Sequence, residues 1–330
     1  MNSQLTASIA IILATYVVSL ILTYIVRRAL IAEEVIDRPN ARSSHKVPVP
    51  RGGGWALILV LVPGMITAGL VEHNLRVNLG LIGGTVLLTL VSWIDDRKGA
   101  GIGLRLSMHL LAACLGSLAF SSDQMLLGGL MPYWLDRTLM IIGWAWFINL
   151  YNFMDGIDGL TSVETICVAT GTCLLLAAGN INDPFADTLQ LLLTGAALGF
   201  LVFNWHPAKI FLGDAGSVPL GYLTAFLLIT LAVHGLWIPA IILPLYYIAD
   251  SGITLLKRAA RREKIWQAHR EHYYQRAAQR VRRHDRVVVW VVYANIALMT
   301  AALLAVYMPV AGLAAALAIV GLLLLKMRHS

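Results

Sequence analysis

The sequence predicts an all-α, polytopic integral membrane protein, and composition is the first reason. Of the 330 residues, 58% are hydrophobic and only 13% are charged, and the mean hydropathy is +0.73. A soluble domain of this length usually carries about a quarter charged residues and under half apolar ones. Too little polar surface would remain to cover a water-soluble globule, and the same figures exclude a disordered chain.

Long apolar runs are the second reason. A helix needs about 20 apolar residues to cross the hydrocarbon core of a bilayer. The runs are too unbroken for the alternating strands of a barrel, so they indicate helices. We expect about eleven spans, at roughly 5–26, 55–72, 77–94, 104–120, 138–154, 160–178, 186–204, 217–233, 237–256, 287–307 and 311–326. Pro63 and Gly64 interrupt the second run, which makes it one of the weakest of the set.

The placement of Lys and Arg is the third reason, and it predicts an orientation. The first run follows no positive side chain and precedes Arg27 and Arg28, which favours an uncleaved helix with a periplasmic N-terminus over a signal peptide. With eleven crossings, 23 of the 25 Lys and Arg fall on one side, and Arg76 and Arg137 fall on the other. By the positive-inside rule the charged side, with the C-terminus, is cytoplasmic.

We expect a single transmembrane catalytic domain over 1–330, because the sequence shows no repeat and no soluble module. The cytoplasmic loops would be about 27–54, 95–105, 155–159, 205–216 and 257–286. The net charge of +7 suits membrane lipids or an anionic substrate and requires no nucleic acid. Cys114, Cys167 and Cys173 fall inside predicted spans without metal-ligand spacing, so we expect core packing.

Carboxylates border the same charged side. Asp95 and Asp96 are adjacent at the end of a predicted span. Acids at a membrane border are costly unless they are paired, hydrated or bound to a cation, and adjacent carboxylates repel. A metal ion, a cationic ligand or use of one acid as a base would resolve the conflict. The alternative is a solvated helix end balanced by Arg97 and Lys98.

A second polar segment repeats every three residues, at Asn149, Asn152, Asp155 and Asp158. On a continuous helix these side chains would spread over half the circumference. They can converge only if the helix ends, and two glycines beside the acids supply such an end. Asn and Asp oxygens are ligands that Mg²⁺ accepts, so the segment predicts a metal site near the membrane border.

Three further features allow alternatives. Asp214, between two glycines at the start of a span, is either a helix cap or a metal ligand that bridges to phosphate. His269 and His272, on one face of a basic helix, predict phosphate contact or a surface helix attracted to lipid headgroups. Glu164 and Asp250 lie inside spans, where a helix-packing hydrogen bond or ion pair is the default and a proton pathway is the rival.

Five motifs occur in order along most of the chain: PVPRGGG, DDRKG followed by Arg105, NLYNFMDGIDGL, NWHPAKIFLGDAGS and AHREHYYQR. In these motifs the chain resembles the polyprenyl-phosphate N-acetylhexosamine-1-phosphate transferases of glycosyltransferase family 4. The resemblance implies that undecaprenyl phosphate attacks the β-phosphate of a UDP-N-acetylhexosamine and that UMP leaves. It also implies Mg²⁺, with Mn²⁺ as a substitute, a bacterial inner-membrane location and an active site that faces the cytoplasm. A homodimer is a further expectation. The glycines of the first motif would let backbone approach a ligand.

The resemblance implies roles for the acids. Asp95 would bind or deprotonate the lipid phosphate, with Asp96 beside it. Asn152 and Asp214 would ligate Mg²⁺. Asp155 would join Asp95, Asp96 and His272 as a catalytic residue.

It also implies a nucleotide pocket. Asp155 and Asp158 would shape the metal and uridine region. Lys46, Asn204 and Phe211 would line the nucleotide pocket. Arg270, together with His272, would contact the sugar diphosphate.

Two departures bear on the branch. Many relatives carry histidines where this chain has Tyr274 and Gln275, and His109 stands where relatives often have Gln. These departures favour the O-antigen-initiating branch over the peptidoglycan enzyme, with GlcNAc, GalNAc, FucNAc and QuiNAc donors all open. The main rival is a secondary transporter with a cytoplasmic-side ion site, which should show paired repeats and acids near the midplane. An alcohol phosphotransferase is disfavoured because its D-G-x-x-A-R run is missing.

Overall fold

The computed structural model describes residues 2–39, 47–99, 101–264 and 269–330, and this part of the chain is a bundle of thirteen helices. The helices are α1 (Asn2–Ala32), α2 (Gly54–Val71), α3 (Leu75–Lys98), α4 (Ile102–Ser117), α5 (Tyr133–Phe153), α6 (Leu160–Ala178), α7 (Pro184–Asn204), α8 (Asp214–Val233), α9 (Trp237–Ile242), α10 (Leu245–Ala260), α11 (Tyr273–Val281), α12 (His284–Tyr307) and α13 (Pro309–His329). One short antiparallel pair joins β1 (Ile36–Asp37) to β2 (Val49–Pro50) within the first predicted loop.

The all-α polytopic class is confirmed. Among the described residues, eight helices are long and apolar enough to cross a membrane: α1, α2, α3, α6, α7, α8, α12 and α13. The remaining predicted spans correspond to α4, which has 16 residues, to α5, which carries Asp136 and Arg137 in its first turns, and to the pair α9–α10. The count of eleven and the orientation therefore stay predictions.

Two proline positions behave differently from each other. The predicted span 237–256 is not one helix, because α9 ends at Ile242 and α10 begins at Leu245, after Pro244. Proline has no N–H to donate and its ring clashes with the preceding turn, so it ends the first helix there. Pro63, in contrast, lies inside a continuous α2. Neighbouring helices tolerate such a proline in an apolar bundle, and α2 packs against α3 and α7.

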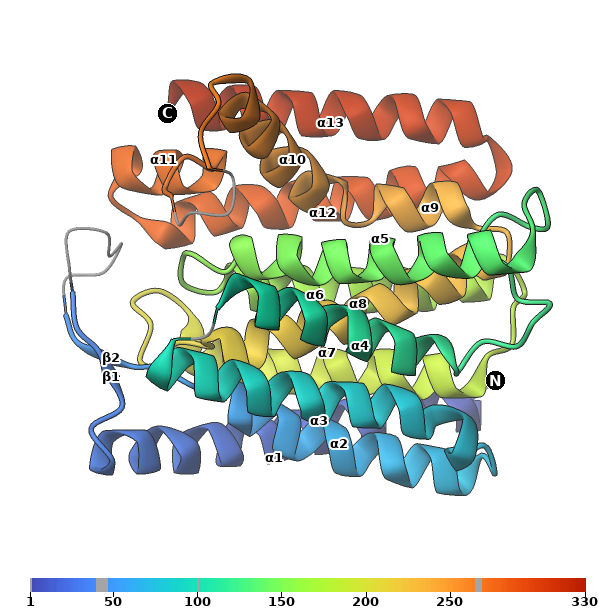
Figure 1. Ribbon diagram of the computed structural model, residues 1–330, viewed down its shortest axis with the longest axis horizontal. Coiled ribbons are helices and arrows are strands. Elements are labelled where there is room, and N and C mark those ends of the chain that lie inside the picture. Colours follow the sequence, from blue (N-terminus) through green and yellow to red (C-terminus); the bar gives the residue numbers. More distant parts are fainter. Residues whose placement is uncertain (1, 40–46, 100, 265–268) are drawn as a thin grey trace.

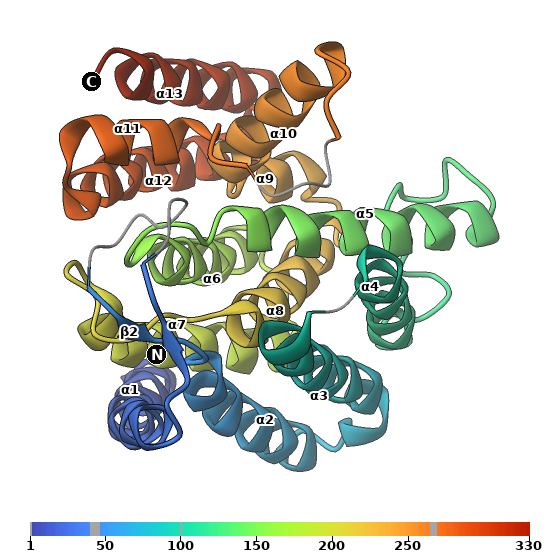
Figure 2. The same cartoon turned by 60° about the vertical axis from the view of Figure 1, so that its left-hand side comes forward.

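The long helices run back and forth along one axis, and the two termini lie at opposite ends of the bundle (Figure 1). Helix α8 lies at its centre, with α3, α5, α6 and α7 around it (Figure 2). Every residue of α8 from Ala215 to Ala232 is buried. A helix that is apolar on all faces needs such a position, because it has no polar face to offer water.

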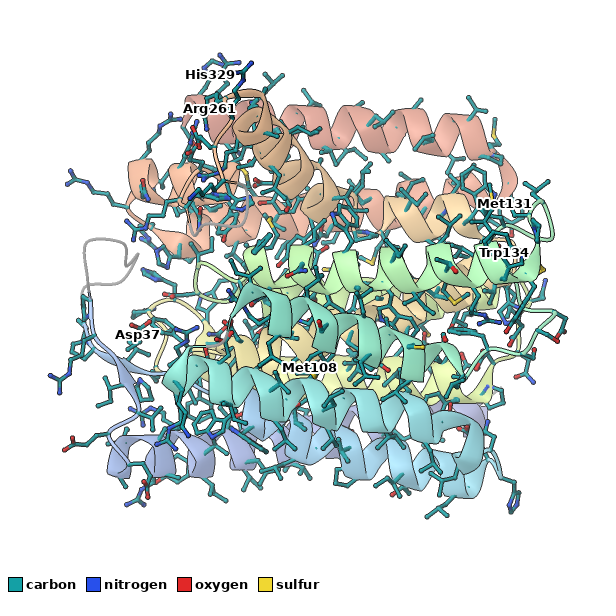
Figure 3. All side chains as sticks on the ribbon, in the orientation of Figure 1. Asp37, Met108, Met131, Trp134, Arg261 and His329 are labelled. Carbon is teal, nitrogen blue, oxygen red and sulfur yellow. The ribbon has the colours of Figure 1, made fainter. Side chains whose placement is uncertain are left out.

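The two ends of the bundle differ in chemistry. Asp37, Arg261 and His329 lie toward one end, whereas Met131 and Trp134 lie at the other (Figure 3). The first end also carries β1, β2, α11 and the C-terminus, and we call it the charged end (Figure 1). Arg137, one of the two basic residues assigned to the opposite side, is buried and donates to the carbonyls of Ser117, Phe120 and Ser121. The guanidinium therefore stabilises the end of α4 and the loop that follows it.

The two buried acids make packing contacts, as their default interpretation predicts. Glu164 of α6 accepts a hydrogen bond of 2.7 Å from Asn295 Nδ2 of α12. Asp250 of α10 accepts hydrogen bonds from the backbone amides of Tyr273 and Tyr274 at the start of α11.

The cysteines are all free, but Cys114 is exposed, so its predicted place in the core is wrong. A small apolar side chain costs little on a helix face that meets lipid.

Candidate active site

Two loops at the charged end are held together by their backbones. The amides of Gly52 and Gly53 both donate to the Phe211 carbonyl, at 3.2 and 2.8 Å, and the amide of Gly54 donates to the Leu212 carbonyl at 2.9 Å. A Cβ on Gly54 would lie 2.2 Å from the Cα of Gly216. These glycines therefore bring protein backbone against protein backbone, whereas the sequence led us to expect an approach to a ligand.

This pairing places Arg51 between two carboxylates. Its Nη2 lies 2.8 Å from Asp96 Oδ1 and 3.0 Å from Asp214 Oδ1. Asp96 also accepts a hydrogen bond of 3.3 Å from the amide of Ala215. The guanidinium offsets the repulsion between two acids that lie close together at the membrane border. Sequence reasoning quoted Arg51 only as part of a loop motif, since nothing local shows that it meets an acid 163 residues away.

Asp95 points to a different partner from Asp96. Its Oδ2 lies 3.4 Å from Arg105 Nη1 of α4. Successive residues on a helix are about 100° apart, so adjacent acids face different sides. The conflict between adjacent carboxylates is thus resolved by two separate arginines.

A cavity of about 600 Å³ opens beside these acids. It lies between α3, α4, α5, α8, α10 and the segment before α11. Four residues that the sequence singled out for the site line it together: Asp95, Asn152, Asp214 and His272. Asn149 of the predicted metal segment and His269 of the predicted phosphate contact also line it. Three further polar residues of the lining had no such predicted role: Arg105, His109 and Gln275. Leu88, Val91, Ile102 and Leu106 add an apolar wall.

Asn152 is fixed by α8. Its Oδ1 accepts a hydrogen bond of 2.6 Å from Ser217 Oγ, one turn into that helix. Asp214 begins the same helix, so one element holds both predicted metal ligands in register. Because the carboxylate and amide oxygens of Asp95, Asn152 and Asp214 share one cavity, the donor set fits Mg²⁺.

Asp155 follows the end of α5 and lies among the other acids. Its Oδ1 accepts a hydrogen bond of 2.7 Å from Thr161 Oγ1. Burial, with a smaller contribution from the charge of Asp214, raises the pKa of Asp155 to about 6. A carboxyl with a pKa near neutrality can accept and release a proton under working conditions.

The predicted nucleotide residues fall in several places. Asn204 is buried, where its Oδ1 accepts from the Gly159 amide and its Nδ2 donates to the Ile210 carbonyl, both at 3.0 Å. Phe211 is half-buried and its backbone joins residues 50–53. Asp158 contacts two histidines, described below, and Lys46 lies outside the described residues.

The last motif does not form the expected helix at its histidines. His269 and His272 precede α11, which begins at Tyr273, although their rings still lie 4.9 Å apart. Burial, with the nearby charges of His272 and Arg258, lowers the pKa of His269 to about 4, so this imidazole is neutral at pH 7. His272 Nδ1 lies 3.3 Å from Asp250 Oδ1, which fixes its ring at the cavity wall. Arg270 is half-buried in the same segment.

Comparison with known proteins finds similarity to one family over the middle of the chain. A family model for glycosyl transferase family 4 matches residues 78–232. Over these residues the chain is similar to glycosyl transferase family 4. The match runs from α3 through most of α8, so it includes Asp95, Asn152 and Asp214 of the cavity. Arg51 and the segment before α11 lie outside it.

Curated relatives are similar over longer stretches. A probable undecaprenyl-phosphate N-acetylglucosaminyl 1-phosphate transferase of Bacillus subtilis is 27% identical over 287 residues, which cover 80% of this chain and 76% of the relative. A decaprenyl-phosphate N-acetylglucosaminephosphotransferase of Mycobacterium leprae is 31% identical over 58% of this chain, which spans about half (53%) of that relative. A phospho-N-acetylmuramoyl-pentapeptide-transferase of Lacticaseibacillus paracasei is 28% identical over 68% of this chain and 74% of its own length.

Proposed function

We propose that the protein transfers an N-acetylhexosamine 1-phosphate from a UDP-N-acetylhexosamine to undecaprenyl phosphate. An oxygen of the lipid phosphate would form a bond to the β-phosphorus, and the bond from that phosphorus to the bridging oxygen would break. The products are undecaprenyl-diphospho-sugar and UMP. The observation that carries this proposal is the shared cavity, which is lined by Asp95, Asn152 and Asp214 together with aliphatic side chains of α3 and α4.

The cavity suits a lipid phosphate acceptor. Its apolar wall is built from α3 and α4, and exposed leucines continue on α4 at Leu104, Leu110 and Leu111. Arg105 of α4 also lines the cavity, and a guanidinium is well matched to phosphate oxygens. Asp95, 3.4 Å from Arg105, would orient that arginine or take a proton from the acceptor.

The polar wall suits a diphosphate donor. Phosphoryl transfer depends mainly on positioning and on neutralising charge on the phosphate oxygens. Neutralisation is what Mg²⁺ supplies when it is bound, and Asn152 and Asp214 are the side chains that would hold it. His272, which contacts Asp250 and lines the same cavity, would donate a hydrogen bond to the sugar diphosphate. Asp155 and Arg51 would set the charge around these groups.

Both the orientation and the branch belong to the same proposal. The charged end would face the cytoplasm, where 23 of the 25 Lys and Arg are assigned by the span pattern.

The product would initiate O-antigen or another cell-envelope polysaccharide. Gln275, which replaces a histidine of many relatives, lines the cavity and is a candidate for the difference in donor sugar. The site acids lie at one end of the bundle, unlike the midplane acids that a transporter would need.

The experiment combines purified protein with undecaprenyl phosphate, Mg²⁺ and a panel of UDP-GlcNAc, UDP-GalNAc, UDP-FucNAc and UDP-QuiNAc. We expect UMP release and a lipid-linked sugar with at least one donor. Asp214→Asn should lower the rate by about 100-fold or more, because transition-state charge stabilisation of this kind is typically of that size. Asp123→Asn, at an exposed position in the loop between α4 and α5, is the control and should keep the wild-type rate.

Two outcomes would contradict the proposal. One is the absence of UMP release with every donor from protein that elutes as a folded species. The other is wild-type activity of Asp214→Asn at saturating Mg²⁺, which would remove Asp214 from the metal site.

A further inference from the structure

Three side chains from distant parts of the chain meet next to the turn between α5 and α6. They are Asp158 in that turn, His206 in the segment between α7 and α8, and His284 at the start of α12. His206 Nδ1 lies 2.6 Å from Asp158 Oδ2, and His284 Nδ1 lies 3.2 Å from the same oxygen. The three ligand atoms all lie within 4.8 Å of one another.

The cluster is largely buried and open at one side. The side chains of Asp158 and His284 are 7% and 9% exposed, whereas that of His206 is 28% exposed. Burial of a carboxylate is costly unless partners stabilise its charge. His206, His284 and the Ala208 amide lie within contact distance of this carboxylate and supply such partners. The ionised carboxylate is the form that binds a metal ion.

His284 Nδ1 lies near two partners that require opposite protonation states of this nitrogen. Its Nδ1 lies 3.4 Å from the Asp158 amide nitrogen, whose N–H needs a lone pair there. The same Nδ1 lies 3.2 Å from Asp158 Oδ2, where it would need a proton. One nitrogen cannot serve both partners. A cation between Nδ1 and Oδ2 would take the single lone pair of Nδ1, and the longer contact with the amide would then be given up.

We propose that Asp158, His206 and His284 form a binding site for a divalent transition-metal ion of the zinc class. Two imidazole nitrogens and one carboxylate oxygen suit Zn²⁺, whereas Mg²⁺ prefers oxygen ligands alone. Tetrahedral bonds of 2.0–2.1 Å separate neighbouring ligand atoms by about 3.3 Å. The His284–Asp158 pair already has this spacing, and His206 needs to move back by less than an ångström. A fourth position would be left for water on the side of His206.

The site is separate from the oxygen-lined cavity and does not depend on the proposed transfer reaction. It would tie the α5–α6 turn and the α7–α8 segment to α12, which lies outside the family match. Asp158 already accepts a hydrogen bond of 3.2 Å from the Ala208 amide, so the segment that leads to Phe211 is anchored at the same point. A metal ion here would fix the backbone that pairs with residues 50–53.

The test measures metal content directly. Full-length protein in detergent is equilibrated with Zn²⁺ in the presence of excess Mg²⁺, freed of unbound metal and analysed by elemental mass spectrometry. We expect about one Zn²⁺ per chain. His206→Asn and His284→Asn keep an amide that can donate to Asp158 but is a poor zinc ligand. Loss of an outer-shell partner weakens metal binding by about 10- to 100-fold. Each of these substitutions removes a direct ligand, so each should weaken Zn²⁺ binding by more than that.

Matched controls separate this site from other histidines and from the cavity. His234→Asn alters a histidine at the other end of α8, 3.8 Å from Asp183, and should keep the Zn²⁺. Asp214→Asn should also keep it. Zinc content that is far below one per chain in the wild type, or unchanged in His206→Asn and His284→Asn, overturns the proposal.

A second measurement uses the wild type only, in case the variants do not fold. Co²⁺ replaces Zn²⁺, and the visible spectrum reports the ligand geometry. Intense bands of four-coordinate Co²⁺ support the site, and the weak spectrum of hydrated Co²⁺ contradicts it.

Discussion

Single acids at the charged end meet different partners, and the partner decides what each acid can do. Asp96 shares Arg51 with Asp214, and Asp95 pairs with Arg105. Asp155 instead accepts a hydrogen bond from the neutral hydroxyl of Thr161. Burial disfavours the charged form of Asp155 more than this hydrogen bond favours it, so the pKa of Asp155 is raised.

The raised pKa of Asp155 predicts an effect on stability. Folding raises the pKa of Asp155 from 3.8 to about 6, so between these pH values the folded state binds more protons than the unfolded state. Stability is therefore lost as the pH rises through this window, and the penalty is complete above pH 6. Asp155→Asn removes the ionisable group and should stabilise metal-free protein at pH 7.5 by an amount on the order of 1 kcal/mol. The gain should vanish near pH 4, as measured by thermal unfolding in detergent with chelator.

Glu33→Gln, which alters an exposed acid just after α1, should shift the unfolding temperature at neither pH. Equal shifts of Asp155→Asn at pH 4 and pH 7.5 would show that the carboxyl does not titrate as described.

The sequence predicted these acids better than it predicted their partners. Asp95, Asn152 and Asp214 stand out locally, because each is a polar group at the border of an apolar run. Arg51, His206 and His284 do not stand out, since basic and imidazole side chains are ordinary in polar loops. Their significance comes from contacts between distant parts of the chain, from the 48 residues between Asp158 and His206 to the 163 residues between Arg51 and Asp214. Only tertiary structure shows such pairs.

At the scale of elements, α11 is a helix that depends on its neighbour. It has nine residues, too few for a stable isolated helix, and its N-cap residue His272 makes no side-chain capping bond. Asp250 of α10 takes that role, with hydrogen bonds of 2.9 and 3.0 Å from the amides of Tyr273 and Tyr274. The same carboxylate fixes His272 at the cavity wall.

Asp250→Ala should therefore loosen both the helix and the histidine. Loss of a helix cap costs about 0.5–2 kcal/mol, and here two buried amides lose their acceptor. We expect faster hydrogen exchange at the amides of 273–281 and unchanged exchange in α8. Exchange in α11 as slow as in the wild type would mean that packing against α12 and α13, rather than the cap, holds the helix.

Element boundaries show the limit of hydrophobic pattern alone. Apolar runs located most of the long helices to within a few residues, because a membrane helix must be apolar over its length. The run 237–256 concealed the break at Pro244, since α9 and α10 are both apolar. The five residues of α5 before 138 were missed because Asp136 and Arg137 make them look like a loop. In the structure the Asp136 carboxylate accepts hydrogen bonds from the amides of Leu126 and Leu127. These bonds offset the free-energy cost of burying the carboxylate.

At the scale of the whole molecule, charge is concentrated at one end of an apolar bundle. The chain runs along the long axis so that its two termini lie at opposite ends (Figure 1). Four residues from four parts of the sequence line one cavity beside the charged end: Asp95, Asn152, Asp214 and His272. We propose that this end faces the cytoplasm and joins a soluble nucleotide sugar to a membrane-bound phosphate.

Sided membrane vesicles test that claim most directly. A UDP-sugar cannot cross a sealed bilayer, so adding it outside inverted or right-side-out vesicles reports which face holds the site. We predict UMP release from inverted vesicles, and release from right-side-out vesicles only after they are permeabilised. Equal release from both kinds of intact vesicle, or release from right-side-out vesicles alone, would contradict the account.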